Sequence, residues 1–408
     1  MDEQRVYDSL FPHYVEIATV TQYHRRGGKP GGWGGHATMF VSGAERDEDA
    51  GYPRLRLVDE ETDLSSPVSG IGVSVNRIFT NVNWVAIPGR DVFLHGGVTP
   101  DSELDEAAYE AAIARAAAAG WFAGIRVEDA LARLRPIGMT AEEFIVRHSI
   151  GTDFALTFAR GVYGVRLPLG RAAIGAVVDH LNQVNDAARS SGYTWNAYTN
   201  NCSHVIHNAL AAAGVWDPKH ARGPGMVNLA RDLASVAASV VRGGISDFSF
   251  PANNFVRAYE AGNEHPIENV DAAFADHDIA RTIARGWLST APGALVVRYP
   301  IHDLARNRLF EMGRDPFLFS VPAIWDKRDK FLKLTRDPAA EITDLGANLR
   351  WFRDRYAAGL ASSSAGTDGG RAGGAFGPFR ERFRAYIAGA LAATNEQLLR
   401  YERLRAAA

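Results

Sequence analysis

Alternating apolar and polar positions mark the first quarter of the chain as a series of short β-strands. Residues 14–20 alternate as a half-buried strand does, and residues 36–41, His-Ala-Thr-Met-Phe-Val, are rich in strand-forming residues. Glycine, proline and asparagine separate three further strand patterns, at residues 54–58, 72–75 and 82–87. These patterns predict an antiparallel sheet with short connections.

Helical periodicity predominates after residue 100. The first of these segments begins with acidic residues, which suit the positive end of the helix dipole. It stops at Gly120, and glycine is a common residue just after the end of a helix. Thr140 and Glu143 form a capping-box pattern at the start of another. The predicted helices cover residues 101–119, 127–134, 140–146, 171–189 and 202–213, with one further strand at 162–167.

The pattern divides the chain into four parts. We expect an α+β domain at residues 10–227 with a helical insert at 101–160, and a mainly helical domain at 228–361 that contains one strand, at 294–299. Residues 362–377 are rich in serine and glycine, which is typical of a flexible linker. An amphipathic helix at 378–408 closes the chain, and we expect it to serve as a docking or dimer element.

Composition excludes several classes of protein. The 408 residues carry a net charge of -3, so no basic excess indicates a nucleic-acid partner. The single cysteine excludes intrachain disulfides and cysteine-rich zinc modules. No apolar stretch reaches the length of a membrane span, and the first residues lack the pattern of a signal peptide. We therefore expect a cytoplasmic protein, with signal-independent export or a trimmed signal left open.

The single cysteine, Cys202, stands where a helix is predicted to begin. Asn200 and Asn201 are good N-cap residues, and the apolar period starts directly after them. The free amides and positive dipole end of a first helical turn favour a thiolate, which is the reactive form of cysteine. Alternatively, a lone cysteine is a small buried apolar residue without chemistry.

A thiolate nucleophile needs a general base, and histidine is the usual one. His36 opens a predicted strand directly after Gly34-Gly35, where missing side chains leave room for a cleft. His95 is a similar but weaker candidate. His204 and His207 are expected on the cysteine's own helix but on other faces.

Two segments together resemble a known family. Asn201-Cys202-Ser203-His204-Val205-Ile206 is similar to the nucleophile motif of NlpC-type papain-like enzymes, and Gly35-His36-Ala37-Thr38-Met39-Phe40 is similar to their histidine strand. The histidine precedes the cysteine here, as in the circularly permuted branch, which includes the lecithin-retinol acyltransferase-like proteins. The resemblance implies a papain-like antiparallel sheet with a cysteine-bearing helix packed on it. It covers about 30 residues.

The resemblance also implies roles for single residues. Cys202 would be the nucleophile and His36 the general base, with a third polar residue orienting the imidazole. Asp59 is the expected third residue, with Glu60 and Asn83 as rivals. Asn201, Tyr193 and Tyr198 are expected to orient groups or to assist the oxyanion. The implied reaction is hydrolysis or acyl transfer at a peptide, amide or acyl-ester bond through a thioester, without a cofactor.

Three other features leave alternatives open. The glycine-rich loop with Arg25, Arg26, Lys29 and Trp33 borders His36, and we expect it to act as a lid or substrate clamp, or else as a plain surface loop. A metal site is disfavoured because Cys202, His204 and His207 point in different helical directions. A binding or scaffold protein that keeps the fold without the chemistry is the main alternative to an enzyme; a metal-dependent enzyme is a less favoured one.

Overall fold

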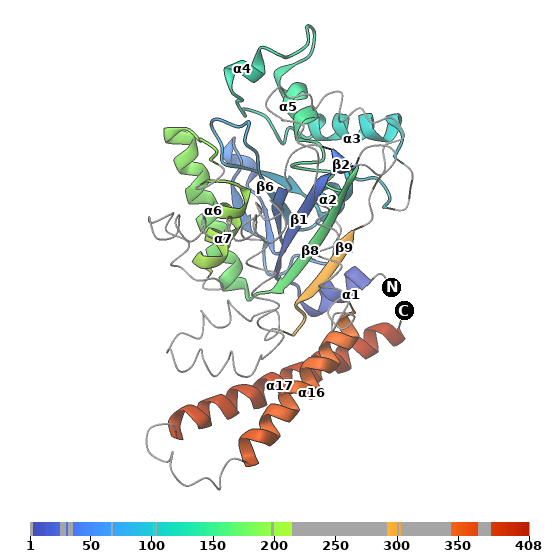
Figure 1. The fold of residues 1–408 in the computed structure, drawn as a ribbon, viewed down its shortest axis with the longest axis vertical. Coiled ribbons are helices and arrows are strands. Elements are labelled where there is room, and N and C mark those ends of the chain that lie inside the picture. Colours follow the sequence, from blue (N-terminus) through green and yellow to red (C-terminus); the bar gives the residue numbers. More distant parts are fainter. Residues whose placement is uncertain are drawn as a thin grey trace, which may run out of the picture.

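The computed structural model describes residues 3–24, 30–31, 36–66, 68–100, 102, 104–196, 200–213, 292–299, 302, 344–365 and 377–407. These residues form a mixed α+β fold around an antiparallel sheet (Figure 1). The strands are β1 (Tyr14–His24), β2 (Pro30–Gly31), β3 (His36–Val41), β4 (Ala44–Arg46), β5 (Leu55–Leu57), β6 (Ile71–Val75), β7 (Trp84–Pro88), β8 (Arg160–Pro168) and β9 (Leu295–Tyr299). The helices are α1 (Glu3–Leu10), α2 (Arg90–His95), α3 (Glu106–Ala118), α4 (Asp129–Ala132), α5 (Ala141–Ser149), α6 (Arg171–Ser191), α7 (Cys202–Ala212), α16 (Leu345–Ala365) and α17 (Gly377–Ala406), with a 3-10 turn at Glu48–Ala50.

The main sheet has the strand order β7-β6-β3-β1-β8-β9, and β2 pairs with the end of β1. Every pairing between the described strands is antiparallel, as predicted. The strand predicted at residues 54–58, however, is β5, which pairs with β4 in a separate two-stranded sheet. The strand β9 pairs with β8, although the sequence pattern assigned it to a separate helical domain. The residues at 295–299 therefore belong to the same sheet as the first half of the chain.

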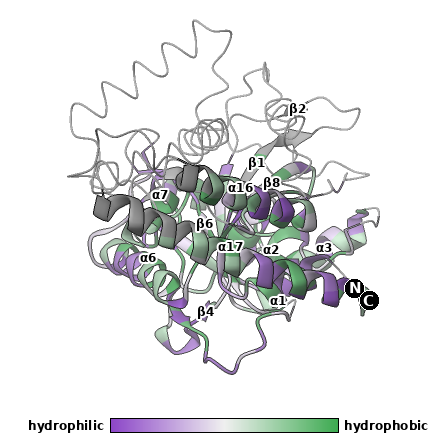
Figure 2. Cartoon of the chain, turned by 90° about the horizontal axis from the view of Figure 1, so that it is seen from below, coloured by the Kyte–Doolittle hydropathy of each residue, from purple (hydrophilic) through white to green (hydrophobic). Residues whose placement is uncertain are grey.

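Helices cover the two faces of the sheet. Figure 1 shows α6 and α7 together on one side, and α2 and α3 on the other. The amphipathic period that predicted α6 places Ile174, Val177, Val178 and Leu181 in the core, and hydrophobic and hydrophilic residues both occur along this helix in Figure 2. Both faces of β3 and β6 are buried, which agrees with a sheet that is covered on each side.

The C-terminal helix packs within its own chain. The helix α17 lies against α16 and against α1, so that the two ends of the chain come together in Figure 1. Arg400 bonds Ser9 and Arg405 pairs with Glu3 at this contact. The predicted linker begins later than expected, because residues 362–365 continue α16, and its middle lies outside the described residues. Dimerisation through this helix stays a prediction.

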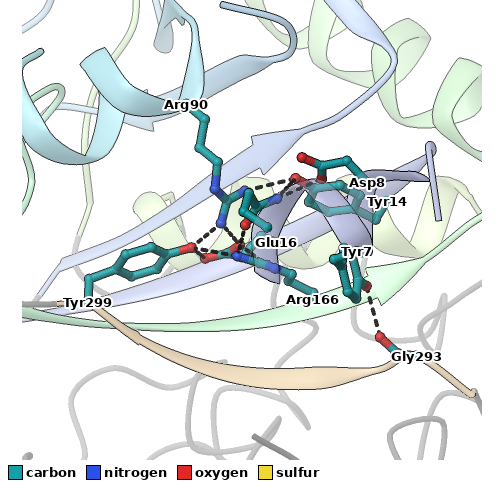
Figure 3. Close-up of polar contacts among 9 residues, drawn as sticks. Tyr7, Asp8, Tyr14, Glu16, Arg90, Arg166, Gly293 and Tyr299 are labelled. Atoms are coloured by element: carbon teal, nitrogen blue, oxygen red, sulfur yellow. Dashed lines mark hydrogen bonds and ion pairs between the residues drawn. The ribbon is translucent and has the colours of Figure 1, made fainter. Parts of the chain in front are cut away.

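A charged cluster is buried between the sheet and α2 (Figure 3). Glu16 of β1 is 1% exposed and accepts from Arg90, from Arg166 Nε at 2.9 Å and from the Tyr299 hydroxyl at 2.7 Å. Burial alone would raise the pKa of Glu16, but the two guanidinium groups outweigh it and lower the pKa to about 2. Gly164 leaves room for the carboxylate, since a Cβ there would lie 1.9 Å from Glu16 Oε1. The cluster ties β9 to β1, β8 and α2.

No described helix has both the length and the apolar character that crossing a membrane would require.

Replacing Glu16 by glutamine should destabilise the protein by about 3–5 kcal/mol, because two buried arginines would lose their shared carboxylate. Urea unfolding of the full chain measures this change. The matched control is Glu110→Gln, which breaks a half-exposed ion pair with Arg147 and should cost less than about 1 kcal/mol. Equal effects of the two substitutions would contradict the importance given to the buried cluster.

Candidate active site

Cys202 stands at the first position of α7, as the sequence predicts. Asn201 caps the helix: its Oδ1 accepts from the backbone N–H of His204 at 3.2 Å, and its carbonyl accepts from the same N–H at 3.0 Å. Val205, Ile206, Ala209 and Leu210 are buried in the core, and Cys202 is half-buried at its margin. The sulfur therefore combines a helix N-terminus with partial access to solvent, which is the setting of a reactive thiol.

Tyr193 precedes α7 and lies close enough to Cys202 for the charge of the cysteine to act on it. The backbone N–H of Tyr193 donates to Thr80 O at 2.8 Å, which fixes the segment that precedes α7 to the loop between β6 and β7. The ring is 6% exposed, and in the described part of the chain its hydroxyl oxygen is buried without a hydrogen-bond partner. Burial first, and then the charge of Cys202, raises the pKa of Tyr193. The structure thus brings Tyr193 and Cys202 together, whereas Tyr198 lies outside the described residues.

His36 is bonded elsewhere. Its Nε2 lies 2.9 Å from Ser74 Oγ, and Ser74 Oγ in turn donates to Asp153 Oδ1 at 2.8 Å. If Ser74 gives its one hydrogen to Asp153, His36 must donate from Nε2, which assigns the neutral Nε2–H tautomer. Asn76 Nδ2 donates to the second oxygen of Asp153, also at 2.8 Å. Burial, aided by the charge of Arg160, lowers the pKa of His36 to about 3.

The register of the strands decides which face carries His36. Side chains alternate along a strand, so His36 and Phe40 share one face of β3, and Ser74 and Gly72 lie beside them on β6. The helix α2 covers that face of the sheet. Phe93 of α2 packs directly on Gly72, where a Cβ would come within 2.0 Å of the Phe93 ring.

The opposite face belongs to α6 and α7. Trp84 is in register with Val75 on this face, and its indole Nε1 donates to Leu181 O of α6 at 2.9 Å. The helix α7 packs on α6 and against β3 and β6. Cys202 and the His36 ring therefore lie on opposite faces of the sheet. The His36 ring bonds Ser74, and the charge of Arg160 acts on it. The Cys202–His36 pair expected from the sequence is not formed in this structure.

Asp59 is not the partner of His36 either. It is exposed in a turn that follows β5, next to Glu60, which pairs with Arg171 at the start of α6. Tyr193 follows the other end of this 21-residue helix, about 30 Å away at ~1.5 Å per residue. Asp59 and Glu60 are thus remote from the cysteine, and Ser74 fills the position beside His36.

Asn83, the other rival, has its backbone N–H bonded to Asn185 Oδ1 at 2.8 Å and is itself buried. The loop residues Arg25, Arg26, Lys29 and Trp33, and the side chain of His207, lie outside the described residues. His204 turns its Nδ1 to Asn201 Oδ1, at 2.9 Å.

Sequence reasoning missed Ser74 and Asp153. The sequence contains one weak indication of Ser74, which is a polar residue inside the apolar strand Ile71–Val75. Asp153 is fully buried in a turn. Among the described residues, no three histidine, cysteine, aspartate or glutamate side chains gather closely enough to hold a metal ion.

His95, the weaker histidine candidate, ends α2 on the same side of the sheet as His36. Its Nδ1 lies 3.1 Å from Thr157 Oγ1, and its ring packs edge-on against His302 and Tyr299. Burial, and then the charges of His302 and Arg90, lower the pKa of His95 to about 3. His95 is therefore a neutral core residue near neutral pH.

This burial predicts a loss of stability in mild acid. Below an unfolded-state pKa of ~6.5 the unfolded chain binds a proton at His95 that the folded chain does not, so stability falls as the pH drops towards 3. Between pH 7 and pH 5 the free energy of unfolding of the wild type should fall by about 2 kcal/mol more than that of His95→Gln. Urea unfolding at both pH values measures it, and equal losses would contradict the neutral buried imidazole.

Comparison of the chain with protein-family models, with curated proteins and with solved structures finds no match.

Proposed function

We propose that the protein is a thiol hydrolase or acyltransferase with Cys202 as its nucleophile. The thiolate would attack the carbonyl of a peptide, amide or acyl ester and form a thioester, which water or a second nucleophile then resolves. The observation that carries the proposal is the setting of Cys202. It opens α7 as a half-buried residue, and its charge acts on Tyr193, whose hydroxyl is buried and has no hydrogen-bond partner among the described residues.

The surroundings of the sulfur suit this chemistry. The positive end of the α7 dipole stabilises a thiolate at Cys202, and it also stabilises the oxyanion that forms when the thiolate attacks. The Tyr193 hydroxyl is a second donor for that oxyanion, since it has a hydrogen to give and no described acceptor. Asn201 acts on the same site indirectly, because it fixes the start of the helix.

The motif resemblance supports the same proposal. A permuted NlpC-type, papain-like arrangement requires that the cysteine helix pack on the sheet that contains the histidine strand. The helix α7 does pack against β3, and Cys202 is its first residue. The antiparallel α+β architecture is compatible with this family.

The motif implies that His36 is the general base, but the contacts of His36 do not support that role. In the described conformation His36 is held by Ser74 on the other face of the sheet, and it is neutral with a pKa lowered to about 3. A base with so low a pKa accepts a proton from a thiol poorly. We therefore assign the activation of Cys202 to the terminus of α7 and not to His36.

A second candidate function follows from the same observation. His36 is bonded to Ser74 on the other face of the sheet, as in a binding or scaffold protein that keeps the fold but not the chemistry. The two candidates differ in the reactivity of the thiol.

Alkylation of Cys202 by iodoacetamide between pH 5 and 9, followed by mass spectrometry, separates them. At pH 6.5 the folded wild type should react at least ten times faster than the same chain unfolded in urea, whose thiol pKa is ~8.5. Because Cys202 is the single cysteine, the signal is unambiguous, and Cys202→Ser is the blank.

His36→Asn is the matched variant in this experiment. Its alkylation rate should stay within about twofold of the wild type, because the imidazole does not contact the sulfur. A folded wild type that reacts no faster than the unfolded chain would overturn the enzyme proposal and leave the binding protein.

A further inference from the structure

A projecting loop between α4 and α5 exposes two large apolar side chains. We call residues 133–138, Arg-Leu-Arg-Pro-Ile-Gly, the tip loop; it lies beside α4 at the far end of the molecule from α17 in Figure 1. Ile137 is 107% exposed and Leu134 is 52% exposed. All six residues of the tip loop are exposed, although Leu131, just before it, is buried in the core.

The loop holds Ile137 at the apex of a defined turn. Met139 N donates to Pro136 O at 3.2 Å, and Gly138 has φ +89°, which together are typical of a type II turn with Ile137 at its second position. Leu134 N bonds Leu131 O and Arg135 N bonds Ala132 O, so the start of the loop continues the turns of α4. The backbone therefore presents the isoleucine outwards, and no described residue covers it.

Two cations flank these apolar side chains. Arg133 and Arg135 are exposed, and neither forms an ion pair within the described residues. The acidic residues nearby, Glu128, Asp129 and Glu142, belong to the starts of α4 and α5, at the base of the loop. The tip itself is thus apolar and positively charged.

We propose that the tip loop docks the protein on a lipid bilayer that contains anionic lipids. Ile137 and Leu134 enter the boundary between headgroups and acyl chains, while Arg133 and Arg135 lie among the headgroups and contact their phosphates. A convex apolar apex with cations beside it fits a soft, anionic surface, and each contribution alone would bind too weakly to hold a protein there. The inference is independent of the chemistry assigned to Cys202.

Co-sedimentation of the full chain with vesicles tests the proposal. One set of vesicles is phosphatidylcholine alone, and the other contains about one third phosphatidylglycerol. The wild type should bind the anionic vesicles more tightly, and added salt should weaken that binding. Ile137→Ser should lower the partition coefficient on the anionic vesicles about tenfold, since the insertion of an isoleucine is lost. The pair Arg133→Gln and Arg135→Gln should lower it about 25-fold on anionic vesicles only, at about fivefold for each arginine.

Val68→Ser is the matched control, because Val68 is also strongly exposed, at 76%, and has no arginine beside it. It should bind like the wild type. The proposal is overturned if the wild type ignores both vesicle types or if Ile137→Ser binds as well as the wild type. It is also overturned if the wild type is an oligomer by light scattering and Ile137→Ser is a monomer, which would make the tip loop a protein contact.

Discussion

The alternation of side chains along β3 is the constraint on which the relation between the candidate groups depends. Met39 and Phe40 are adjacent in sequence and both are buried, one on the α7 face of the sheet and one on the α2 face. A shift of one residue in the pairing with β1 or β6 would exchange the two faces and would put the polar side chains of Thr38 and His36 against α7. The packing of the core thereby fixes the direction of His36.

The α2 face combines a dense core with polar groups that are paired locally. One cluster holds Glu16 between two arginines, and the other joins His36 to Asp153 through Ser74. Charged groups buried in a core are stable when their partners are in place. Two glycines allow this close packing because they have no Cβ. The Glu16 carboxylate lies against Gly164, and the Phe93 ring lies against Gly72. This face is best described as a rigid support for the sheet, with the candidate chemistry on the other face.

Much of the fold could be predicted from the sequence, because periodicity is a local signal. The strand at residues 36–41, the helix that begins at Cys202 and the Thr140 cap of α5 are where the pattern predicts them. The membership of β9 in the sheet could not be predicted, because its partner β8 lies more than a hundred residues earlier in the chain. The short helix α2, which provides Arg90 and Phe93, has too few turns for a periodic signal.

The candidate site was predicted in part. The position of Cys202 at a helix start follows from Asn201 and the apolar period. The direction of His36 does not follow, because alternation along a strand does not say which face the cysteine helix covers. Asp59 was chosen for its place after a strand, but that strand pairs with β4 in a separate two-stranded sheet.

The separation of His36 from Cys202 is the central claim, and the titration of the His36 ring by nuclear magnetic resonance tests it most directly. The His36 imidazole should stay neutral from pH 8 down to about pH 5, also in Cys202→Ala, since the ring bonds Ser74 and not the sulfur. A His36 that titrates above pH 6 in the wild type, with a pKa that falls by one unit or more in Cys202→Ala, would show an ion pair with the thiolate and would contradict the account.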